Sequence, residues 1–465
     1  MRTTLVYPGI TGKGFDSLGQ GMDSGWISHG LAILAACVKQ KGFAVDLIDL
    51  RALRSWEDYR EQLLGRRPDV LGVSMMSVDY DPGMECLRIA REVLPQAVTV
   101  VGGPHPTLML DEVRDSPYID HIFLGEAEIT FPEFLMRQQA GQRSDRVIPS
   151  VHPDLDALPL TDHEFFLQEW RQRGYNSDSP EAPFVEELPP PFVTIITGRG
   201  CKYNCSYCQP AERFIFGRTV RQRSVANVMA ELQELRDRYQ FRSFMFHDDC
   251  LTEDRDWVMA FCRAYRSAGF RQPFFCQSRA DIIVKNEDMV QLMAESGLKG
   301  YFIGFESGSD RVLRFIRKGT KRRDNLEAAR ICKKYGIAIW ANYMLGLPTE
   351  TKEEMMETIS MLKEIDPDYY SPAFYTPHPG SDLYDYCIEN SLSLIQSHHG
   401  YRRNPNPSEP KIKGVDYAFL RWALVESQRR TLPNQLKRVA RRWRRRLARS
   451  SGLVHRLWQR ASVGG

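Results

Sequence analysis

Alternating strand-like and helix-like segments dominate residues 1 to 127 of this chain. Five short apolar runs are typical of buried strands, and helix-like stretches at residues 31–42, 55–64 and 84–93 lie between them. Consecutive strands joined by helices form parallel sheets, which bind ligands at the carboxyl ends of their strands. We therefore expect a doubly wound, Rossmann-like parallel sheet within residues 1–140. The runs are 3–7, 44–50, 70–78, 97–103 and 121–127.

A second alternation follows a stretch of different composition. Residues 141–191 are rich in Pro, Asp and Ser, which is typical of a linker. Six further strand-like runs then alternate with helix-like segments over residues 192–390, and Ser224 is placed to cap a helix over 225–239. A full (β/α)8 barrel needs about 250 residues. The sequence therefore predicts an α/β chain whose second domain is a partial (β/α)6 TIM barrel. The six runs are 193–197, 243–249, 273–281, 299–307, 338–348 and 369–377.

The C-terminal extension, residues 391–465, ends in a basic helical tail. Twelve Lys or Arg and no Asp or Glu lie between Arg429 and Arg460, so the rest of the chain carries a net charge of −9. Leu436, Trp443 and Leu447 belong to one apolar stripe of a predicted helix. Such a helix could lie on an anionic membrane or pack on the acidic body, whereas no aromatic-lined module favours nucleic acid. No apolar run reaches the length of about 18 residues that spans a bilayer, and no secretion signal opens the chain. We expect a cytoplasmic protein that could contact the inner membrane surface.

Three cysteines lie within the stretch GRGCKYNCSYCQP, in the spacing C-x3-C-x2-C. They are Cys201, Cys205 and Cys208, and the other seven cysteines are scattered as in a reduced protein. Structural zinc needs four ligands, and no second pair follows. An iron–sulfur cubane held by three thiolates keeps one iron open for chemistry. The pattern favours such a cluster over three unligated core cysteines or a structural metal site completed by a distant ligand.

With these cysteines and Tyr207, the chain resembles the radical S-adenosylmethionine (SAM) enzymes. The resemblance covers residues 192–390 and includes HDDCLTED at 247–254, CQSRAD at 276–281 and GFESGSDRVLRFIRKG at 304–319. It implies a [4Fe-4S] cluster held by Cys201, Cys205 and Cys208, which reduces SAM to a 5′-deoxyadenosyl radical. Carboxylates suit the amine or ribose of SAM, and Arg and Ser suit its carboxylate. The implied SAM-binding residues are Tyr207, which would lie beside the adenine, Asp248, Asp249, Ser278, Arg279, Glu306 and Ser307.

The first domain resembles the cobalamin-binding module that precedes the radical SAM barrel in one branch of that family. VGGPHPT at 101–107 and LGEAE at 124–128 carry this resemblance. Glycines let a backbone approach a flat ligand closely. The cobalt-ligating pattern D-x-H-x-x-G fits residues 16–21 with Leu18 in the place of histidine. Bound cobalamin would therefore have no histidine below cobalt. Alternatively, the domain could have lost the cofactor. The implied cobalamin-binding residues are Leu18, Ser74, Gly102, Gly103 and Glu126.

Together these resemblances imply an enzyme of the cobalamin-dependent radical SAM methyltransferase or anaerobic cyclase branch. We expect methylation of an unactivated carbon in a small-molecule or lipid substrate, with electrons from a donor of the flavodoxin or ferredoxin type. A cobalamin-dependent anaerobic oxidative cyclase is the first alternative. A non-catalytic iron–sulfur or cobalamin-binding protein is the second.

Overall fold

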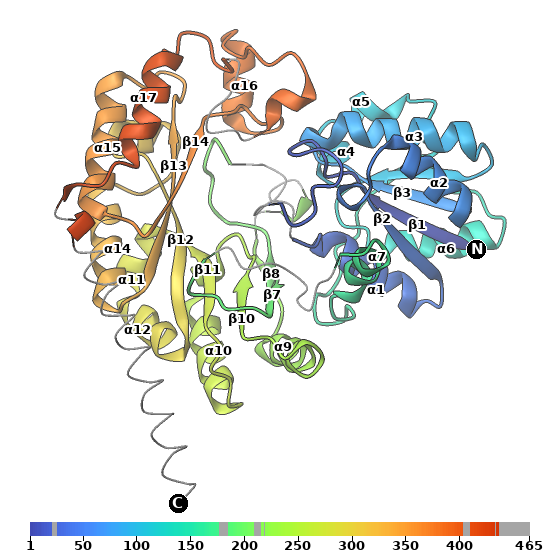
Figure 1. The fold of residues 1–465 in the computed structure, drawn as a ribbon, viewed down its shortest axis with the longest axis horizontal. Helices are drawn as coiled ribbons and strands as arrows, with labels where there is room; N and C mark the ends of the chain where they lie inside the picture. The colour runs from blue at the N-terminus through green and yellow to red at the C-terminus, as the bar shows by residue number, and fades with distance from the viewer. Residues whose placement is uncertain are drawn as a thin grey trace, which may run out of the picture.

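The computed structural model describes residues 1–20, 26–175, 185–208, 215–217, 219–402, 410–432 and 434–436. Figure 1 shows an N-terminal α/β domain beside an open barrel whose outer side is covered by helices. The sequence predicted both units.

The N-terminal domain is built on a six-stranded, fully parallel sheet with the order β2-β1-β3-β4-β5-β6. This order reverses between β1 and β3, and open α/β sheets bind ligands beside such a switch point. Five strands confirm the predicted runs, although β3 ends at Ser74 rather than at residue 78. The strands are β1 (Arg2–Tyr7), β2 (Ala44–Asp49), β3 (Val70–Ser74), β4 (Val98–Gly102), β5 (His121–Phe123) and β6 (Val147–Ile148).

Helices cover both faces of this sheet. Apolar side chains of α1, α6 and α7 pack on one face, and those of α2, α3 and α5 pack on the other. Ser28 caps α1 and Ser55 caps α2, each by accepting a hydrogen bond from a first-turn N–H. The helices are α1 (His29–Gln40), α2 (Trp56–Arg66), α3 (Tyr80–Val93), α4 (Pro104–Leu108), α5 (Leu110–Arg114), α6 (Thr130–Gln139) and α7 (Glu164–Gln172).

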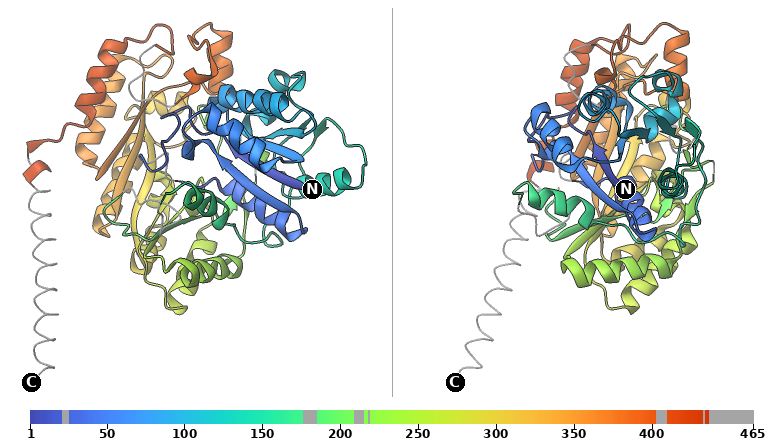
Figure 2. Two further views of the ribbon diagram at one scale, coloured as in Figure 1. Left: turned by 45° about the vertical axis from the view of Figure 1, so that its right-hand side comes forward. Right: turned by 90° about the vertical axis from the view of Figure 1, so that its right-hand side faces the viewer.

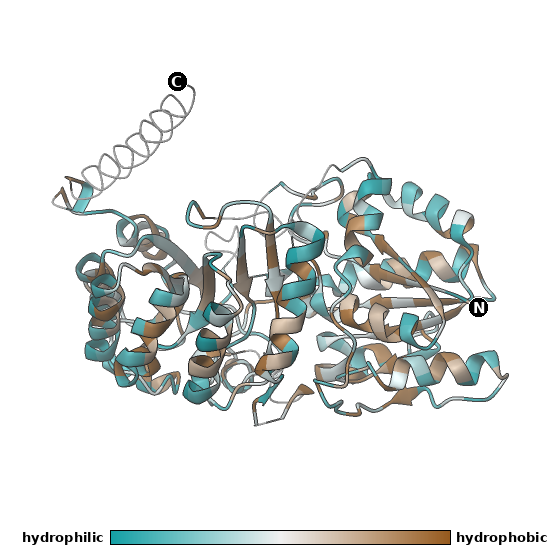
Figure 3. Ribbon diagram, turned by 90° about the horizontal axis from the view of Figure 1, so that it is seen from below, coloured by the Kyte–Doolittle hydropathy of each residue, from teal (hydrophilic) through white to brown (hydrophobic). Residues whose placement is uncertain are grey.

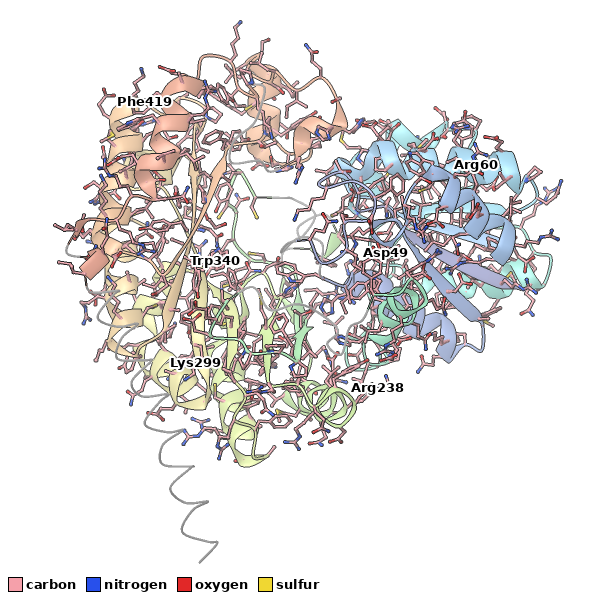
Figure 4. The ribbon with its side chains drawn as sticks, viewed as in Figure 1. Asp49, Arg60, Arg238, Lys299, Trp340 and Phe419 are labelled. Carbon is pink, nitrogen blue, oxygen red and sulfur yellow. The ribbon has the colours of Figure 1, made fainter. Side chains whose placement is uncertain are left out.

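The segment expected as a linker contributes β6 and α7 to the fold. Helix α7 is held by a fully buried ion pair at the end of β2, where Arg51 Nη2 lies 2.7 Å from Asp49 Oδ2. Trp170 of α7 donates from Nε1 to the same carboxylate oxygen at 2.9 Å. Figure 4 shows Asp49 on the side of the domain that faces the barrel. This stretch is therefore packed structure, because its apolar and indole groups complete the core.

The second domain is a half-barrel of six parallel strands, in the order β14-β13-β12-β11-β10-β7. All six confirm the predicted runs. Hydrophobic residues fill the strands in Figure 3, whereas the surrounding helices alternate hydrophobic and hydrophilic residues. The strands are β7 (Phe192–Ile195), β10 (Ser243–Phe246), β11 (Phe274–Ser278), β12 (Leu298–Glu306), β13 (Ala338–Leu345) and β14 (Tyr369–Phe374). The helices are α9 (Val225–Tyr239), α10 (Arg255–Ser267), α11 (Ala280–Lys285), α12 (Glu287–Ser296), α13 (Asp310–Phe315), α14 (Arg322–Lys334) and α15 (Lys352–Ile365).

After β14 come α16 (Asp382–Glu389), a 3-10 turn at His398–Tyr401 and α17 (Tyr417–Ser427), and the last two lie in the C-terminal extension. Figures 1 and 2 show the α16 region beside the helices of the N-terminal domain, while α17 lies on the outer side of the barrel. Leu436 of the predicted basic helix is described and exposed, whereas the part with Trp443 and Leu447 lies outside the described residues. No helix in the described part of the chain has the length and apolar character needed to cross a bilayer.

The buried ion pair at the end of β2 predicts a large stability effect. Asp49→Ala leaves the Arg51 guanidinium buried without its counter-charge, which costs about 3–5 kcal/mol. We expect a clearly lower thermal unfolding midpoint by circular dichroism. Asp46→Ala on the same strand is the control, because Asp46 is half exposed and its 3.2 Å pair with Arg66 is worth about 0–1 kcal/mol. Equal midpoints for the two variants would contradict this account.

Candidate functional site

Two cavities meet where the carboxyl ends of the two sheets face each other. The first, of about 450 Å³, is lined by loops that follow β1, β3, β4 and β5, and by residues after β7 and β10. The second, of about 510 Å³, is lined by the cysteine loop and by the ends of β11 to β14. His247 and Asp249, which follow β10, line both cavities. A ligand in one cavity would therefore lie next to a ligand in the other.

The cysteine loop is fixed at both ends. It begins at β8 (Gly198–Arg199), which pairs antiparallel with β9 (Arg221–Gln222). Gly200 has φ +95°, and a Cβ there would lie 3.0 Å from the carbonyl oxygen of Thr219, so the bend requires glycine. Further along, the Ser206 N–H donates to the Ile316 carbonyl at 2.9 Å. The loop is thus attached to the barrel rather than free at its mouth.

All three thiols of the C-x3-C-x2-C loop line the second cavity, and none forms a disulfide. Burial raises the pKa of Cys201 to about 11, so its thiolate needs a positive partner. Arg279 Nη1 lies 3.7 Å from the sulfur of Cys205. Among the described residues, the sulfur atoms of the three cysteines do not all lie within 4.8 Å of one another. This spread suits a multi-iron cluster better than a single ion.

Charged groups at the end of β12 face the same cavity. Glu306 has φ +61° at an irregular point of the β12–β13 pairing, and its Oε1 accepts from Lys318 Nζ at 3.0 Å. Lys318 also donates to the hydroxyl of Tyr207, 3.1 Å away. Burial raises the pKa of Tyr207 well above its ordinary value, so the phenol stays neutral. A strained backbone beside a buried charged network is common at ligand sites.

The structure brings five of the seven predicted SAM-binding residues to the second cavity. They are Tyr207, Asp249, Ser278, Arg279 and Glu306.

Asp248 and Ser307 point elsewhere. The Asp248 carboxylate accepts hydrogen bonds from the Thr197 N–H at 3.1 Å and from the Thr197 hydroxyl at 2.7 Å, and it lines the first cavity only. Ser307 Oγ lies 3.2 Å from Thr358 Oγ1, against α15.

The first cavity is mostly apolar and holds several buried polar atoms without partners. Among the described residues, these include His29 Nδ1, Glu128 Oε2 and His247 Nε2. Burial lowers the pKa of His247 to about 4, so its imidazole is neutral. Buried polar atoms normally have hydrogen-bond partners. A bound ligand with polar groups at its edge would supply the partners that these three atoms lack. The cavity is large and mostly apolar, with polar groups at only a few points. It therefore fits a cofactor such as a corrin.

Four of the five predicted cobalamin-binding residues line this cavity: Ser74, Gly102, Gly103 and Glu126. Gly103 has φ +102°, and a Cβ there would lie 3.0 Å from the Met75 carbonyl oxygen. Leu18 does not line the cavity. Its N–H donates to the Arg51 carbonyl at 3.2 Å, and its side chain packs on the hydrophobic core.

A buried ionic cluster joins the two domains beside the first cavity. Arg199, two residues before Cys201, donates to the Glu126 carboxylate, and its Nη2 lies 2.7 Å from Glu128 Oε1. Arg221 pairs with the other oxygen of Glu126. Although burial opposes its charge, Glu128 and Glu126 raise the pKa of Arg199. The Glu126 carboxylate therefore serves the domain interface, which the sequence did not predict.

Arg199, His247 and Lys318 are among the residues of these cavities that sequence reasoning missed. Lys318 and His247 fall inside the stretches 304–319 and 247–254 that drew attention, and Arg199 lies next to the cysteine motif. Their position inside or beside these motifs is the sequence signal that could have identified them.

Comparison with known proteins finds one matching family for each of the two domains. Residues 195–362 match the model of the radical SAM superfamily, and residues 23–135 match that of the B12 binding domain. An uncharacterized methyltransferase of Pyrococcus horikoshii is 28% identical over 382 residues, covering 80% of this chain and 81% of its own. An anaerobic magnesium-protoporphyrin IX monomethyl ester cyclase of Rubrivivax gelatinosus is 26% identical over 404 residues, covering 83% and 69%.

The solved structure of the cobalamin-dependent S-adenosylmethionine radical enzyme OxsB shares the fold. Its TM-score is 0.63 at 17% identity, and the match covers 84% of this chain and 55% of that chain. The chain is thus a radical SAM enzyme that carries a B12-binding domain, a class whose cofactors are a [4Fe-4S] cluster, SAM and cobalamin.

The ionic cluster predicts that the domains separate when its guanidinium is removed. Arg199→Met leaves Glu128 buried without a cation, at a cost of about 3–5 kcal/mol. We expect a lower melting temperature and faster limited proteolysis between the domains. Arg238→Met is the matched control, since Arg238 and Glu234 are about half exposed and 4.0 Å apart; Figure 4 shows Arg238 on the outer surface. Identical proteolysis of the two variants would disprove the role of Arg199.

Proposed function

We propose that this chain is a cobalamin-dependent radical SAM methyltransferase that acts on an unactivated carbon of a small-molecule or lipid substrate. The observation that carries this proposal is the shared wall of the two cavities, formed by His247 and Asp249. A substrate at that wall would be within reach of ligands on both sides. The proposal divides the chain into residues 1–140, 141–191, 192–390 and 391–465.

Cys201, Cys205 and Cys208 would hold the cluster in the second cavity. When bound, a cluster with one unligated iron supplies the electron that cleaves SAM to a 5′-deoxyadenosyl radical, and cobalamin supplies a methyl carrier. The Arg279 guanidinium, 3.7 Å from the sulfur of Cys205, would offset part of the negative charge of the thiolates. Three cysteines would leave one iron of such a cluster without a protein ligand.

The remaining charges of the second cavity suit SAM. Glu306 and Asp249 could accept from the amine or the ribose hydroxyls, while Arg279 and Lys318 could donate to the carboxylate. Burial, followed by the neighbouring Asp248, raises the pKa of Asp249 to about 6, and a bound ammonium would favour its ionised form. Tyr207, held by Lys318, supplies a flat surface for the adenine.

The first cavity suits cobalamin, and the pattern at residues 16–21 would offer it no histidine ligand. Gly102, Gly103 and Ser74 line the cavity wall, and Ser74 offers a hydroxyl. Leu18 takes the histidine position of the D-x-H-x-x-G pattern in the sequence only, because it does not line the cavity. His29, also on the cavity wall, is held through Nε2 by Thr194 Oγ1 at 2.7 Å.

The proposal also covers the electron donor, a membrane contact and an alternative reaction, which the contacts in the two cavities do not address. A flavodoxin- or ferredoxin-type protein would reduce the cluster. The basic tail could contact a membrane, which would favour a lipid substrate. The relative from Rubrivivax gelatinosus makes an anaerobic oxidative cyclisation the alternative reaction.

One experiment separates these functions. The anaerobic, reduced protein is incubated with methyl-labelled SAM and a candidate substrate, and 5′-deoxyadenosine and labelled product are measured. Both products support the methyltransferase, whereas 5′-deoxyadenosine with an unlabelled, oxidised product supports a cyclase. An intact cluster that forms no 5′-deoxyadenosine would favour a non-catalytic protein and refute the proposal.

The cysteine loop gives a sharper prediction. Alanine at Cys201, Cys205 or Cys208 is expected to lower iron content and abolish 5′-deoxyadenosine formation, because each thiolate holds one iron. Cys262→Ala, at a buried position of α10, is the control and should keep full iron content. Normal turnover by any of the three loop variants would contradict the assignment.

Lys318 tests the SAM pocket separately from the cluster. Lys318→Met removes the donor to Glu306 and Tyr207, and a lost hydrogen bond to a charged group costs about 1.5–3 kcal/mol. We expect SAM affinity to fall by about 10- to 100-fold with iron content unchanged, measured by equilibrium dialysis. Lys299→Met, on the exposed opposite end of β12 in Figure 4, should bind SAM normally. Unchanged affinity of Lys318→Met would refute this role.

A further inference from the structure

Three side chains of types that can bind metal ions come together outside the two cavities, from distant parts of the sequence. His105 lies on α4, Glu112 on α5, and His398 on the 3-10 turn of the C-terminal extension. Glu112 Oε2 lies 3.6 Å from His105 Nε2 and 2.6 Å from His398 Nε2. One donor atom from each residue falls within 4.8 Å of the others. This spacing suits a single ion with bonds of about 2.0–2.2 Å.

His105 provides the observation that points to a ligand. Its side chain is 0% exposed, and among the described residues its Nε2 has no hydrogen-bond partner. Its Nδ1 lies 3.2 Å from Ser77 Oγ, which can hold the proton on that nitrogen and leave an Nε2 lone pair aimed at Glu112. A buried nitrogen left without a hydrogen-bond partner destabilises the folded state. Metal coordination would remove this destabilisation.

His398 is oriented in a similar way. Its ring stacks on Tyr80 with centroids 3.9 Å apart, and Asp81 Oδ1 lies 3.9 Å from its Nδ1. Metal-binding histidines commonly direct the second ring nitrogen toward a carboxylate or another acceptor. The side chains of Glu112 and His398 are 33% and 23% exposed, so an ion can enter from solvent.

A plain hydrogen bond between His398 and Glu112 explains only half of the cluster. It leaves His105 Nε2 without a partner and too far from Glu112, at 3.6 Å, for a good hydrogen bond. Coordination of an ion by both histidines and Glu112 would give His105 Nε2 the partner that the hydrogen bond does not provide.

We propose that His105, Glu112 and His398 form a binding site for a divalent transition-metal ion, represented by Zn²⁺, separate from the cysteine loop. Two histidines and one carboxylate are a recurrent ligand set for Zn²⁺ and Fe²⁺. The ion would fasten the C-terminal extension to the N-terminal domain. A second contact lies nearby, where Arg402 Nη1 donates to the Gly12 carbonyl at 2.6 Å. Figures 1 and 2 show these regions side by side.

The test measures zinc retained by the full chain with its iron cluster loaded. Protein is equilibrated with Zn²⁺, passed through a column with a competing chelator of micromolar zinc affinity, and analysed for zinc and iron by mass spectrometry. We expect one zinc per wild-type chain and an affinity at least about tenfold weaker in His398→Ala and Glu112→Gln. His399→Ala, at the exposed neighbouring position, should retain zinc.

Two further measurements distinguish this site from zinc on the loop thiols and from a general loss of stability. A variant with alanine at Cys201, Cys205 and Cys208 should still hold one zinc. Saturating Zn²⁺ should raise the melting temperature of wild type and of His399→Ala, but it should not raise that of His398→Ala above its own zinc-free value. Absence of zinc from wild type, or full retention by His398→Ala, would overturn the proposal.

Discussion

The buried charges of Arg199, Glu126 and Glu128 are the constraint on which the rest of the site depends. Each of these groups would be costly to bury alone, so the pairing fixes how the two domains meet. Arg199 lies two residues before Cys201, and Glu126 lies on the loop after β5. The same contact therefore places the cysteine loop and the glycine edge of β4 on opposite sides of one space.

Parallel strands explain why two cofactor sites can be adjacent in this chain. Each sheet collects its loops at the carboxyl ends of its strands, and the two sheets turn those ends toward each other. His247 and Asp249 then stand between the cavities. The 141–191 segment helps to hold this arrangement, because Phe165 and Phe166 of α7 belong to a core that continues into the barrel.

The periodic strands and local motifs were predictable from sequence, whereas contacts between distant residues were not. Eleven strands of the two sheets matched apolar runs, but β6 has only two residues and carries no periodic signal. Spacing singled out Cys201 as a candidate, and the resemblance carried by VGGPHPT singled out Gly103. Neither could say that Asp248 bonds Thr197 or that Ser307 faces α15, because that depends on how each strand ends. His105 and His398 are nearly 300 residues apart, so only the fold brings them together.

The most direct test of the central claim is a crystal structure of the anaerobically loaded protein with anomalous data at the iron and cobalt absorption edges. The account predicts iron peaks against Cys201, Cys205 and Cys208, a cobalt peak beside Gly103, and His247 and Asp249 between the two. Iron or cobalt peaks elsewhere, or a wall of packed side chains separating them, would contradict it.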